Sequence, residues 1–320
     1  MRHAGPSLTR TFLQVMPTLD ARGRLAGDGY GVSDAPGWRD VVWREHMGTI
    51  RLGTSDVAYV DVGGGGGPPV VFVHGIGGCW QHWIETMPRV ARERRVLALD
   101  LPGFGSSPMP PVGLLAIPYY AQVVEQFCDR LGLGPIELVG HSMGGYIAAD
   151  LAWRRPDRVV NLVLVSPAGL SGHDMSWIEA RAFLGAWRLL QSLPHGRLRR
   201  LLQRPRMRQA VAGWTVRYPA LMSVDLLAAT LVAGCGRPAF GPMTRAGLEY
   251  SFRERLGAVT APTLVVWGRK DSILPAQDAQ RFVELIDDTS VVLMDNTGHA
   301  PMLERPVAFN DLLLEFIGEK

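Results

Sequence analysis

The sequence predicts an α/β fold in which a mostly parallel sheet is flanked by helices and interrupted by an inserted helical segment. Short apolar runs alternate with stretches of helical spacing along most of the chain. One apolar run leads into a Gly-x-Ser-x-Gly sequence that precedes a helix. Such alternation covers both faces of a parallel sheet with helices. It stops between about 169 and 245, which predicts the insertion.

The composition limits the class of protein. The 320 residues suffice for one large α/β domain with an insertion or for two ordinary domains. A net charge of +3 argues against nucleic-acid binding. Three scattered cysteines without a C-x-x-C pair (Cys79, Cys128, Cys235) predict neither a disulfide framework nor a metal site, and fit a reducing, cytoplasmic setting. No apolar run reaches the roughly 18 residues of a membrane-spanning helix.

In chain order, residues 1–40 are rich in glycine, proline and charge, and we expect an N-terminal extension that wraps the domain or is partly disordered. Alternating residues between Val41 and Asp61 predict an antiparallel pair of strands. The wholly apolar run Val70–Val73 predicts a strand buried on both faces, and Arg95–Asp100 predicts another. Helical spacing follows from Tyr119 to Leu131.

The predicted α/β core comprises 41–168 and 246–320, and the predicted helical lid, or cap, comprises 169–245. Strands are expected at Val159–Ser166, at Thr263–Trp267 and at Ser290–Met294. The expected helices of this half, two of them in the lid, are Trp177–Leu193, Val224–Ala233, Ala276–Ile286 and Pro306–Ile317.

The Gly-x-Ser-x-Gly sequence centres on Ser142, between a strand at Pro135–Val139 and a helix at Tyr146–Trp153. In this context a serine sits on a sharp turn with its hydroxyl exposed, near the positive end of a helix dipole. The flanking glycines let strand and helix approach closely. The alternative is a glycine-rich turn that holds an incidental serine.

Serine becomes a nucleophile when a base takes its proton and a carboxylate orients that base. Asp271 and His299 each follow a predicted strand, so they should reach the same sheet edge as Ser142. The order Ser, Asp, His is the one expected for this arrangement. Either side chain taken alone would be an ordinary solvated loop residue or cap. Asp174 is a weaker candidate for the acid, because no strand directly precedes it.

The developing oxyanion also needs hydrogen-bond donors. The backbone N–H groups of Met143 and Ile76 are the candidates, because one follows the nucleophile and the other lies in the glycine-rich loop after His74. We expect His74 to be structural, and Glu304 to brace the last helix. We expect the His141 side chain to support the loop of the nucleophile. The remaining predicted substrate contacts are Gly75, Gly77, His141 and Trp177.

Taken together, these motifs resemble the α/β-hydrolase superfamily, in particular its lid-bearing serine esterases and lipases. The resemblance covers roughly Val41 to Lys320 and rests on the Ser142 elbow, on the Asp271 loop and on Gly298-His299, together with His74-Gly75-Ile76-Gly77-Gly78 and Asp100-Leu101-Pro102-Gly103-Phe104-Gly105-Ser106. It implies an eight-stranded sheet, a lid after the sixth strand and a serine mechanism without a cofactor. It specifies the substrate much less, because the fold hosts many chemistries.

The leading hypothesis is a hydrolase of carboxylic esters with an apolar acyl or alkyl group, acting through an acyl-enzyme. Serine at 142 argues against relatives with an aspartate nucleophile. A carbon–carbon bond hydrolase of the meta-cleavage type is the first alternative, although Ala300-Pro301-Met302 stands where those relatives often carry a tryptophan. Proline iminopeptidase, acyltransferase and cofactor-free peroxidase relatives stay open, as does a ligand-binding member without catalysis.

The predicted lid carries a basic cluster interleaved with leucines. Such a segment can lie on an anionic membrane, steer acidic substrates or simply form a solvated helix face. The sequence does not decide the oligomeric state. The arginines of this cluster are Arg197, Arg199, Arg200, Arg204, Arg206 and Arg208.

Overall fold

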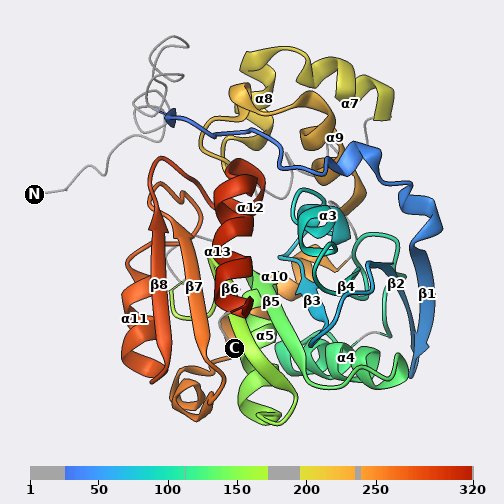
Figure 1. The fold of residues 1–320 in the computed structure, drawn as a ribbon, viewed down its shortest axis with the longest axis vertical. Helices are drawn as coiled ribbons and strands as arrows, with labels where there is room; N and C mark the ends of the chain where they lie inside the picture. Colours follow the sequence, from blue (N-terminus) through green and yellow to red (C-terminus); the bar gives the residue numbers. More distant parts are fainter. Residues whose placement is uncertain (1–25, 112, 172–194, 235–238, 319–320) are drawn as a thin grey trace, which may run out of the picture.

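A computed structural model describes residues 26–111, 113–171, 195–234 and 239–318. Its eight strands form one sheet in the order β1-β2-β4-β3-β5-β6-β7-β8 (Figure 1). β2 pairs antiparallel with both β1 and β4, and all other neighbours are parallel, which confirms the predicted fold class. The strands are β1 (Met47–Leu52), β2 (Ser55–Val62), β3 (Val70–Val73), β4 (Val96–Leu99), β5 (Ile136–His141), β6 (Val159–Val165), β7 (Thr263–Gly268) and β8 (Thr289–Met294).

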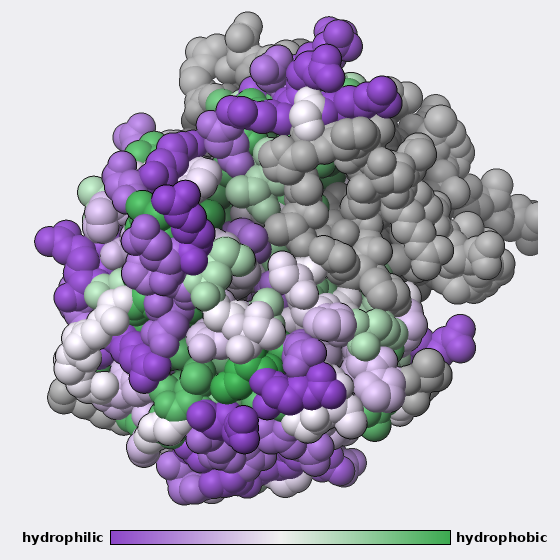
Figure 2. Space-filling model, turned by 90° about the vertical axis from the view of Figure 1, so that its right-hand side faces the viewer, coloured by the Kyte–Doolittle hydropathy of each residue, from purple (hydrophilic) through white to green (hydrophobic). Residues whose placement is uncertain are grey.

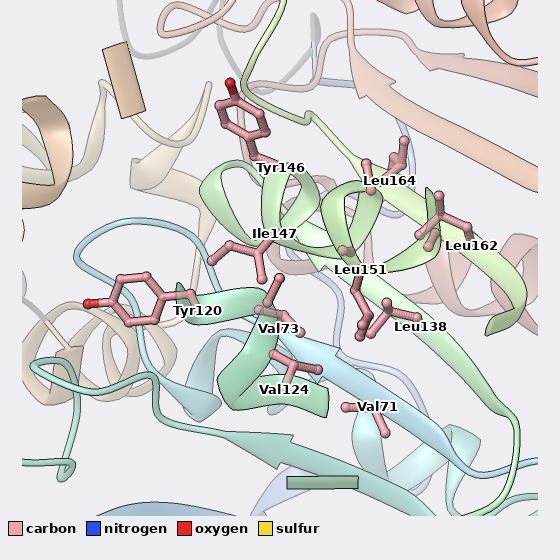
Figure 3. Close-up of a cluster of buried hydrophobic side chains, with 14 of the residues drawn as sticks. Val71, Val73, Tyr120, Val124, Leu138, Tyr146, Ile147, Leu151, Leu162 and Leu164 are labelled. Atoms are coloured by element: carbon pink, nitrogen blue, oxygen red, sulfur yellow. The ribbon is translucent and has the colours of Figure 1, made fainter. Parts of the chain in front are cut away.

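Two hydrophobic cores lie on opposite faces of the sheet. Successive strand residues point to opposite faces, so Val71 and Val73 of β3 pack into one core, while Val70 and Phe72 pack into the other. Every residue of β3 is buried, as its unbroken apolar sequence predicts. Figure 3 shows side chains of the first core between the strands and the helices that cover them.

Helices cover both cores. Buried residues of α4, α5 and α11 belong to the first core, and those of α3, α7, α9 and α13 belong to the second. The helices are α3 (Met87–Val90), α4 (Ile117–Arg130), α5 (Met143–Arg154), α7 (His195–Leu202), α8 (Pro205–Ala212), α9 (Val224–Gly234), α10 (Phe240–Glu249), α11 (Asp278–Leu285), α12 (Pro301–Glu304) and α13 (Pro306–Gly318). Short 3-10 helices are η1 (Trp38–Asp40), η2 (Trp43–Glu45), η3 (Trp80–Trp83), η4 (Pro219–Leu221) and η5 (Arg253–Ala258).

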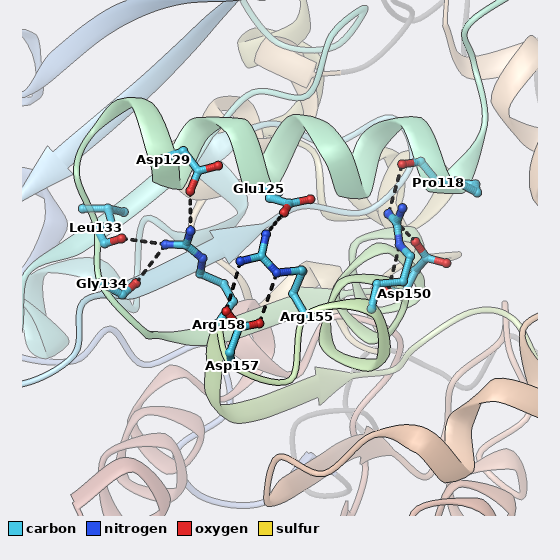
Figure 4. A network of polar contacts seen from close by, with 10 residues as sticks. Pro118, Glu125, Asp129, Leu133, Gly134, Asp150, Arg155, Asp157 and Arg158 are labelled. Atoms are coloured by element: carbon cyan, nitrogen blue, oxygen red, sulfur yellow. Dashed lines mark hydrogen bonds and ion pairs between the residues drawn. The ribbon is translucent and has the colours of Figure 1, made fainter.

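A polar network ties α4 to the segment that follows α5 (Figure 4). Arg155 pairs with Glu125 of α4, and Arg158 pairs with Asp129 of the same helix. Arg158 also donates to the Leu133 carbonyl oxygen at 2.7 Å. Because α5 begins directly after Ser142, these contacts help to hold the helix on which the predicted nucleophile depends.

The segment between β6 and β7 is helical where it is described, with α7, α8, α9 and α10. Figure 1 places α7, α8 and α9 together at one end of the molecule. The expected helix Trp177–Leu193, together with Asp174 and Cys235, lies outside the described residues. We call the described part, 195–234 and 239–249, the helical insertion. That it acts as a lid stays a prediction.

The described part of the N-terminal extension packs against the domain, because Ala26 and Tyr30 are buried. Residues 1–25 lie outside the described residues. Cys79 and Cys128 are both completely buried. Within the described chain, every helix is too short or too polar to cross a bilayer.

Candidate active site

Ser142 sits on a sharp turn between β5 and α5. Its dihedral angles are φ 53° and ψ −117°, an uncommon conformation for a residue with a side chain. The turn needs small neighbours, since a Cβ on Gly140 would lie 2.3 Å from the Gly144 carbonyl oxygen, and a Cβ on Gly144 would lie 2.2 Å from that of Val73. The Gly-x-Ser-x-Gly spacing therefore follows from the close packing of β5, α5 and β3. Strain of this kind is concentrated at functional sites.

Asp271 and His299 come together at the end of the sheet. His299 Nδ1 lies 2.7 Å from Asp271 Oδ2, and both side chains are almost completely buried. The same oxygen accepts a hydrogen bond from Trp267 Nε1 at 2.9 Å. The other carboxylate oxygen accepts from the backbone N–H groups of Ile273, at 2.8 Å, and Leu274, at 3.1 Å. With four donors around it, the carboxylate is fixed in position and orients the imidazole.

The backbone of His299 is anchored on both sides. Its N–H donates to the Thr215 carbonyl oxygen of the helical insertion at 2.9 Å. Its carbonyl oxygen lies 2.9 Å from His141 Nε2, which must be the donor. The rings of His141 and His299 are 4.8 Å apart between centroids. Because His141 directly precedes Ser142, this bond connects the loop that carries His299, called the histidine loop below, to the elbow.

In the described structure no hydrogen bond joins the Ser142 hydroxyl to His299. The two residues are nonetheless neighbours through His141, which contacts His299 and is the residue before the serine. Hydrogen bonds of this kind are often long or poorly aligned without substrate. Ser142 and His299 are exposed by only 6% and 3%, so both residues are largely shielded from water.

The two predicted oxyanion donors belong to the elbow of Ser142 and to the glycine-rich loop beside it. Met143 is the first residue of α5, so its N–H has no partner within the helix. Within the described chain, neither its N–H nor that of Ile76 donates to another group. The loop of Ile76 lies against the elbow, because a Cβ on Gly75 would lie 3.0 Å from Ser142 Cβ. Among the described residues, both N–H groups therefore lack a partner, and both belong to segments next to Ser142.

The other histidines of this region are neutral. Burial lowers the pKa of His74 to about 3 and that of His82 to about 4. Burial, together with the nearby His299, also lowers the pKa of His141 well below its usual value. His74 donates through Nδ1 to Gly75 O at 2.7 Å and accepts from Leu101 N at 3.0 Å through Nε2. It therefore holds the first glycine loop, as the sequence predicts.

Sequence reasoning missed two groups that hold the predicted acid, Asp271, and the predicted base, His299. Trp267 donates to Asp271 from the end of β7, and Thr215 accepts from the His299 backbone. A tryptophan four residues before the acid is a signal that could have suggested the first. The hydrogen bond that the Thr215 carbonyl oxygen accepts could not have been predicted from the sequence, because every residue has such an oxygen. Trp177 lies outside the described residues, and substrate contacts by Gly75, Gly77 and His141 stay predictions.

Comparison with known protein families assigns the chain to one of them. Residues 68–306 match the family model of the alpha/beta hydrolase fold, and the chain belongs to that family. Together with the fold, this defines the protein as a hydrolase of that class. The match confirms the resemblance to the α/β-hydrolase superfamily.

Individual relatives differ in what their names describe. The chain is 32% identical, over 83% of its length and 68% of the relative's, to the dihydrolipoyllysine-residue acetyltransferase component of the acetoin cleaving system of Pseudomonas putida. It is 27% identical to the pimeloyl-[acyl-carrier protein] methyl ester esterase of Aeromonas hydrophila, over 79% and 97% of the two chains. A meta-cleavage product hydrolase from Pseudomonas fluorescens has the same fold, with a TM-score of 0.67 at 23% identity over 86% and 99%.

Proposed function

We propose that the protein hydrolyses carboxylic esters through Ser142, His299 and Asp271. The observation that carries this proposal is the buried Asp271–His299 pair beside a serine on a strained elbow. The pair fixes the imidazole tautomer with Nδ1–H toward the carboxylate, so that Nε2 is free to accept the serine proton. A methyl ester esterase among the similar proteins supports the ester over other acyl substrates.

In the proposed reaction, Ser142 Oγ attacks the ester carbonyl while His299 takes its proton. The N–H groups of Ile76 and Met143 receive the negative oxygen of the tetrahedral intermediate, where the loss of one donor typically costs about 10²- to 10³-fold in rate. The intermediate collapses when His299 gives the proton to the departing alcohol, which leaves an acyl-enzyme. Water, deprotonated by His299, then releases the carboxylic acid and restores the serine.

The proposed substrate carries an apolar acyl or alkyl group. Buried side chains of α7, α8 and α9 are almost all aliphatic and belong to the core that lies beneath the insertion. Small-molecule sites usually have apolar side chains around a few fixed polar groups, and the proposal is that the insertion supplies such side chains. The proposal includes no cofactor. A cytoplasmic setting stays a prediction.

The test is a panel of p-nitrophenyl esters of graded chain length, together with labelling by a fluorophosphonate. The wild-type protein should release p-nitrophenol and be labelled at one site, and Ser142→Ala should lose both. Ser166→Ala is the matched control, because Ser166 is also buried at the end of a parallel strand, also has a positive φ, and its hydroxyl makes no hydrogen bond among the described residues. Unchanged turnover in Ser142→Ala would refute the proposal.

A second candidate is cleavage of a carbon–carbon bond, which the likeness in fold to a meta-cleavage product hydrolase favours. The sequence Ala300-Pro301-Met302 after the base argues against it. A vinylogous diketone acid offered alongside the ester panel separates the two, because the preferred substrate will show the larger kcat/KM. A protein that is neither labelled nor active on either substrate would be a non-catalytic binding member of the family.

We also propose peripheral contact with an anionic lipid surface through the helical insertion. Between residues 195 and 234 the chain has seven arginines and one acidic residue. Hydrophilic residues gather at the top of Figure 2, the level at which Figure 1 places α7 and α8. Two of the six arginines of the predicted basic cluster are engaged within the protein. Arg199 pairs with Asp225, and Arg208 donates to the Met222 carbonyl oxygen. The other four arginines of the cluster are exposed and have no ion-pair partner in the described chain: Arg197, Arg200, Arg204 and Arg206.

Co-sedimentation with phosphatidylglycerol and phosphatidylcholine vesicles tests this contact. The wild-type protein should bind the anionic vesicles alone, and less as salt is added. Replacing Arg197, Arg204 and Arg206 by glutamine should abolish binding. The control variant loses the same amount of charge, because three exposed arginines outside the insertion are replaced by glutamine: Arg92, Arg130 and Arg253. Equal binding by both triple variants, or none by the wild type, would end the proposal.

A further inference from the structure

The carboxylate of Glu304 holds the backbone on both sides of His299. Glu304 ends α12, and its side chain is completely buried. The Gly298 N–H, just before the histidine, donates to both carboxylate oxygens at 2.9 Å. The Ala300 N–H, just after it, donates to Oε1 at 3.2 Å. The loop that carries the proposed base therefore closes around a single carboxylate.

The same carboxylate binds two segments that are remote in the sequence. Oε2 accepts a hydrogen bond from the Arg217 N–H of the helical insertion at 2.8 Å. It also accepts one, at 2.6 Å, from the Tyr30 hydroxyl of the N-terminal segment, which is the described part of the N-terminal extension (26–40). The Tyr30 oxygen in turn accepts from the Tyr218 N–H at 2.8 Å. One buried group thus connects the histidine loop, the insertion and the N-terminal segment.

Further contacts seat the N-terminal segment beside α12. The Gly31 N–H donates to the Glu304 carbonyl oxygen at 2.7 Å. Arg305 donates to the carbonyl oxygens of Asp28, at 3.0 Å, and of Ala26. Its guanidinium also lies over the Tyr30 ring, 5.5 Å from the centroid. The position of the Tyr30 hydroxyl is therefore set by the backbone of the segment as well as by its own bonds.

The donors around Glu304 suit an ionised carboxylate. Three of them are backbone N–H groups, which can only donate. Burial raises the pKa of Glu304 to about 7, against the pull of these hydrogen bonds, so the group is an acceptor on both oxygens at pH 8. In the described chain it has no ion-pair partner. Its charge is balanced by hydrogen bonds alone, so losing one of them leaves it poorly compensated.

We propose that Glu304 is a positioning residue for His299 and that Tyr30 of the N-terminal segment sets the position of Glu304. The inference rests on the proposed serine mechanism and adds to it a requirement for a segment far from the nucleophile in sequence. His299 itself takes no direct contact from Glu304. The carboxylate acts through the two flanking N–H groups, and a displacement of about 1 Å at a catalytic group can cost on the order of 10²-fold in rate.

The test uses Glu304→Gln and Tyr30→Phe at pH 8, with kinetics measured well below the unfolding temperature. Glutamine presents an NH₂ group where N–H donors need an acceptor, and phenylalanine keeps the ring but removes the bond to Glu304. We expect kcat to fall by about 10²-fold and about tenfold, respectively, with KM little changed, because the loss is in alignment of the base.

Two controls separate positioning from stability. Glu85→Gln alters another buried glutamate that binds the same N-terminal segment, through Ser33 at 2.8 Å, but does not contact the histidine loop. Tyr119→Phe removes one tyrosine hydrogen bond, to Ser55 at 3.0 Å, elsewhere in the protein. Both should lower the unfolding temperature while kcat stays at the wild-type value.

The low-field NMR signal of the His299 Nδ1 proton gives a second readout that needs no turnover. It should shift or broaden in Glu304→Gln and Tyr30→Phe and stay unchanged in both controls. Wild-type kcat together with a wild-type signal in the two test variants would overturn the inference. If the wild-type protein neither turns over esters nor reacts with the fluorophosphonate, the proposed function fails, and the NMR signal alone still decides the positioning role.

Discussion

Replacing Asp271 by asparagine is the sharpest test of how the base is oriented. Asp271 Oδ1 accepts from two backbone N–H groups, at 2.8 and 3.1 Å, which can only donate. The amide oxygen of asparagine must therefore take that side. Its NH₂ group then faces His299 Nδ1 and Trp267 Nε1, which lie 2.7 and 2.9 Å from the oxygen that it replaces. Two donors cannot bond to a third donor.

His299 can relieve this conflict only by moving its proton to Nε2, where it can no longer accept from Ser142. The same replacement in a serine protease triad lowers kcat about 10⁴-fold, which corresponds to about 5 kcal/mol of lost transition-state stabilisation. We expect a loss of this size in kcat on a p-nitrophenyl ester. The unpaired Trp267 N–H should also cost about 1–3 kcal/mol in the free energy of unfolding.

The control is Asp278→Asn, since Asp278 is equally buried and binds Ser171 and Arg281 at 2.8 Å, away from the histidine. It should lose stability and keep kcat. Circular dichroism confirms folding of both variants before the assay. If folded Asp271→Asn keeps kcat within about tenfold of the wild type, the role of Asp271 as the orienting acid is refuted.

Three further predictions concern Trp267, Gly144 and His74. Trp267→Phe keeps the ring and removes one donor to Asp271, so kcat should fall about tenfold while KM holds; unchanged kcat would show that the indole N–H is not needed. Gly144→Ala places a methyl group 2.2 Å from the Val73 carbonyl oxygen, so calorimetry should show a loss of at least about 1–3 kcal/mol of stability. Burial lowers the pKa of His74 from 6.5 to about 3, so the unfolded chain binds the proton first as the pH falls. Stability should drop below pH 6.5, by about 2 kcal/mol at pH 5 from His74 alone. Urea unfolding should show a shallower pH dependence in His74→Asn, and an equal slope would contradict this account.

The sequence by itself determined the sheet and the residues that approach its edge. Apolar runs such as Val70–Val73 have one stable place, buried on both faces, and the alternation with helices makes the sheet parallel. Once the strands are parallel, the loops after β5, β7 and β8 lie at the same edge of the sheet, where Asp271 contacts His299. Local pattern and chain connectivity are enough for that result.

Only the tertiary structure decided what holds the histidine loop. Tyr30 and Glu304 are 274 positions apart, and no periodicity in the chain relates them. Thr215 and Arg217 take part through their backbones, so their side chains carry no signal of the contact. A hydrogen bond between distant backbone groups depends on how whole elements pack, and packing is a property of the folded molecule.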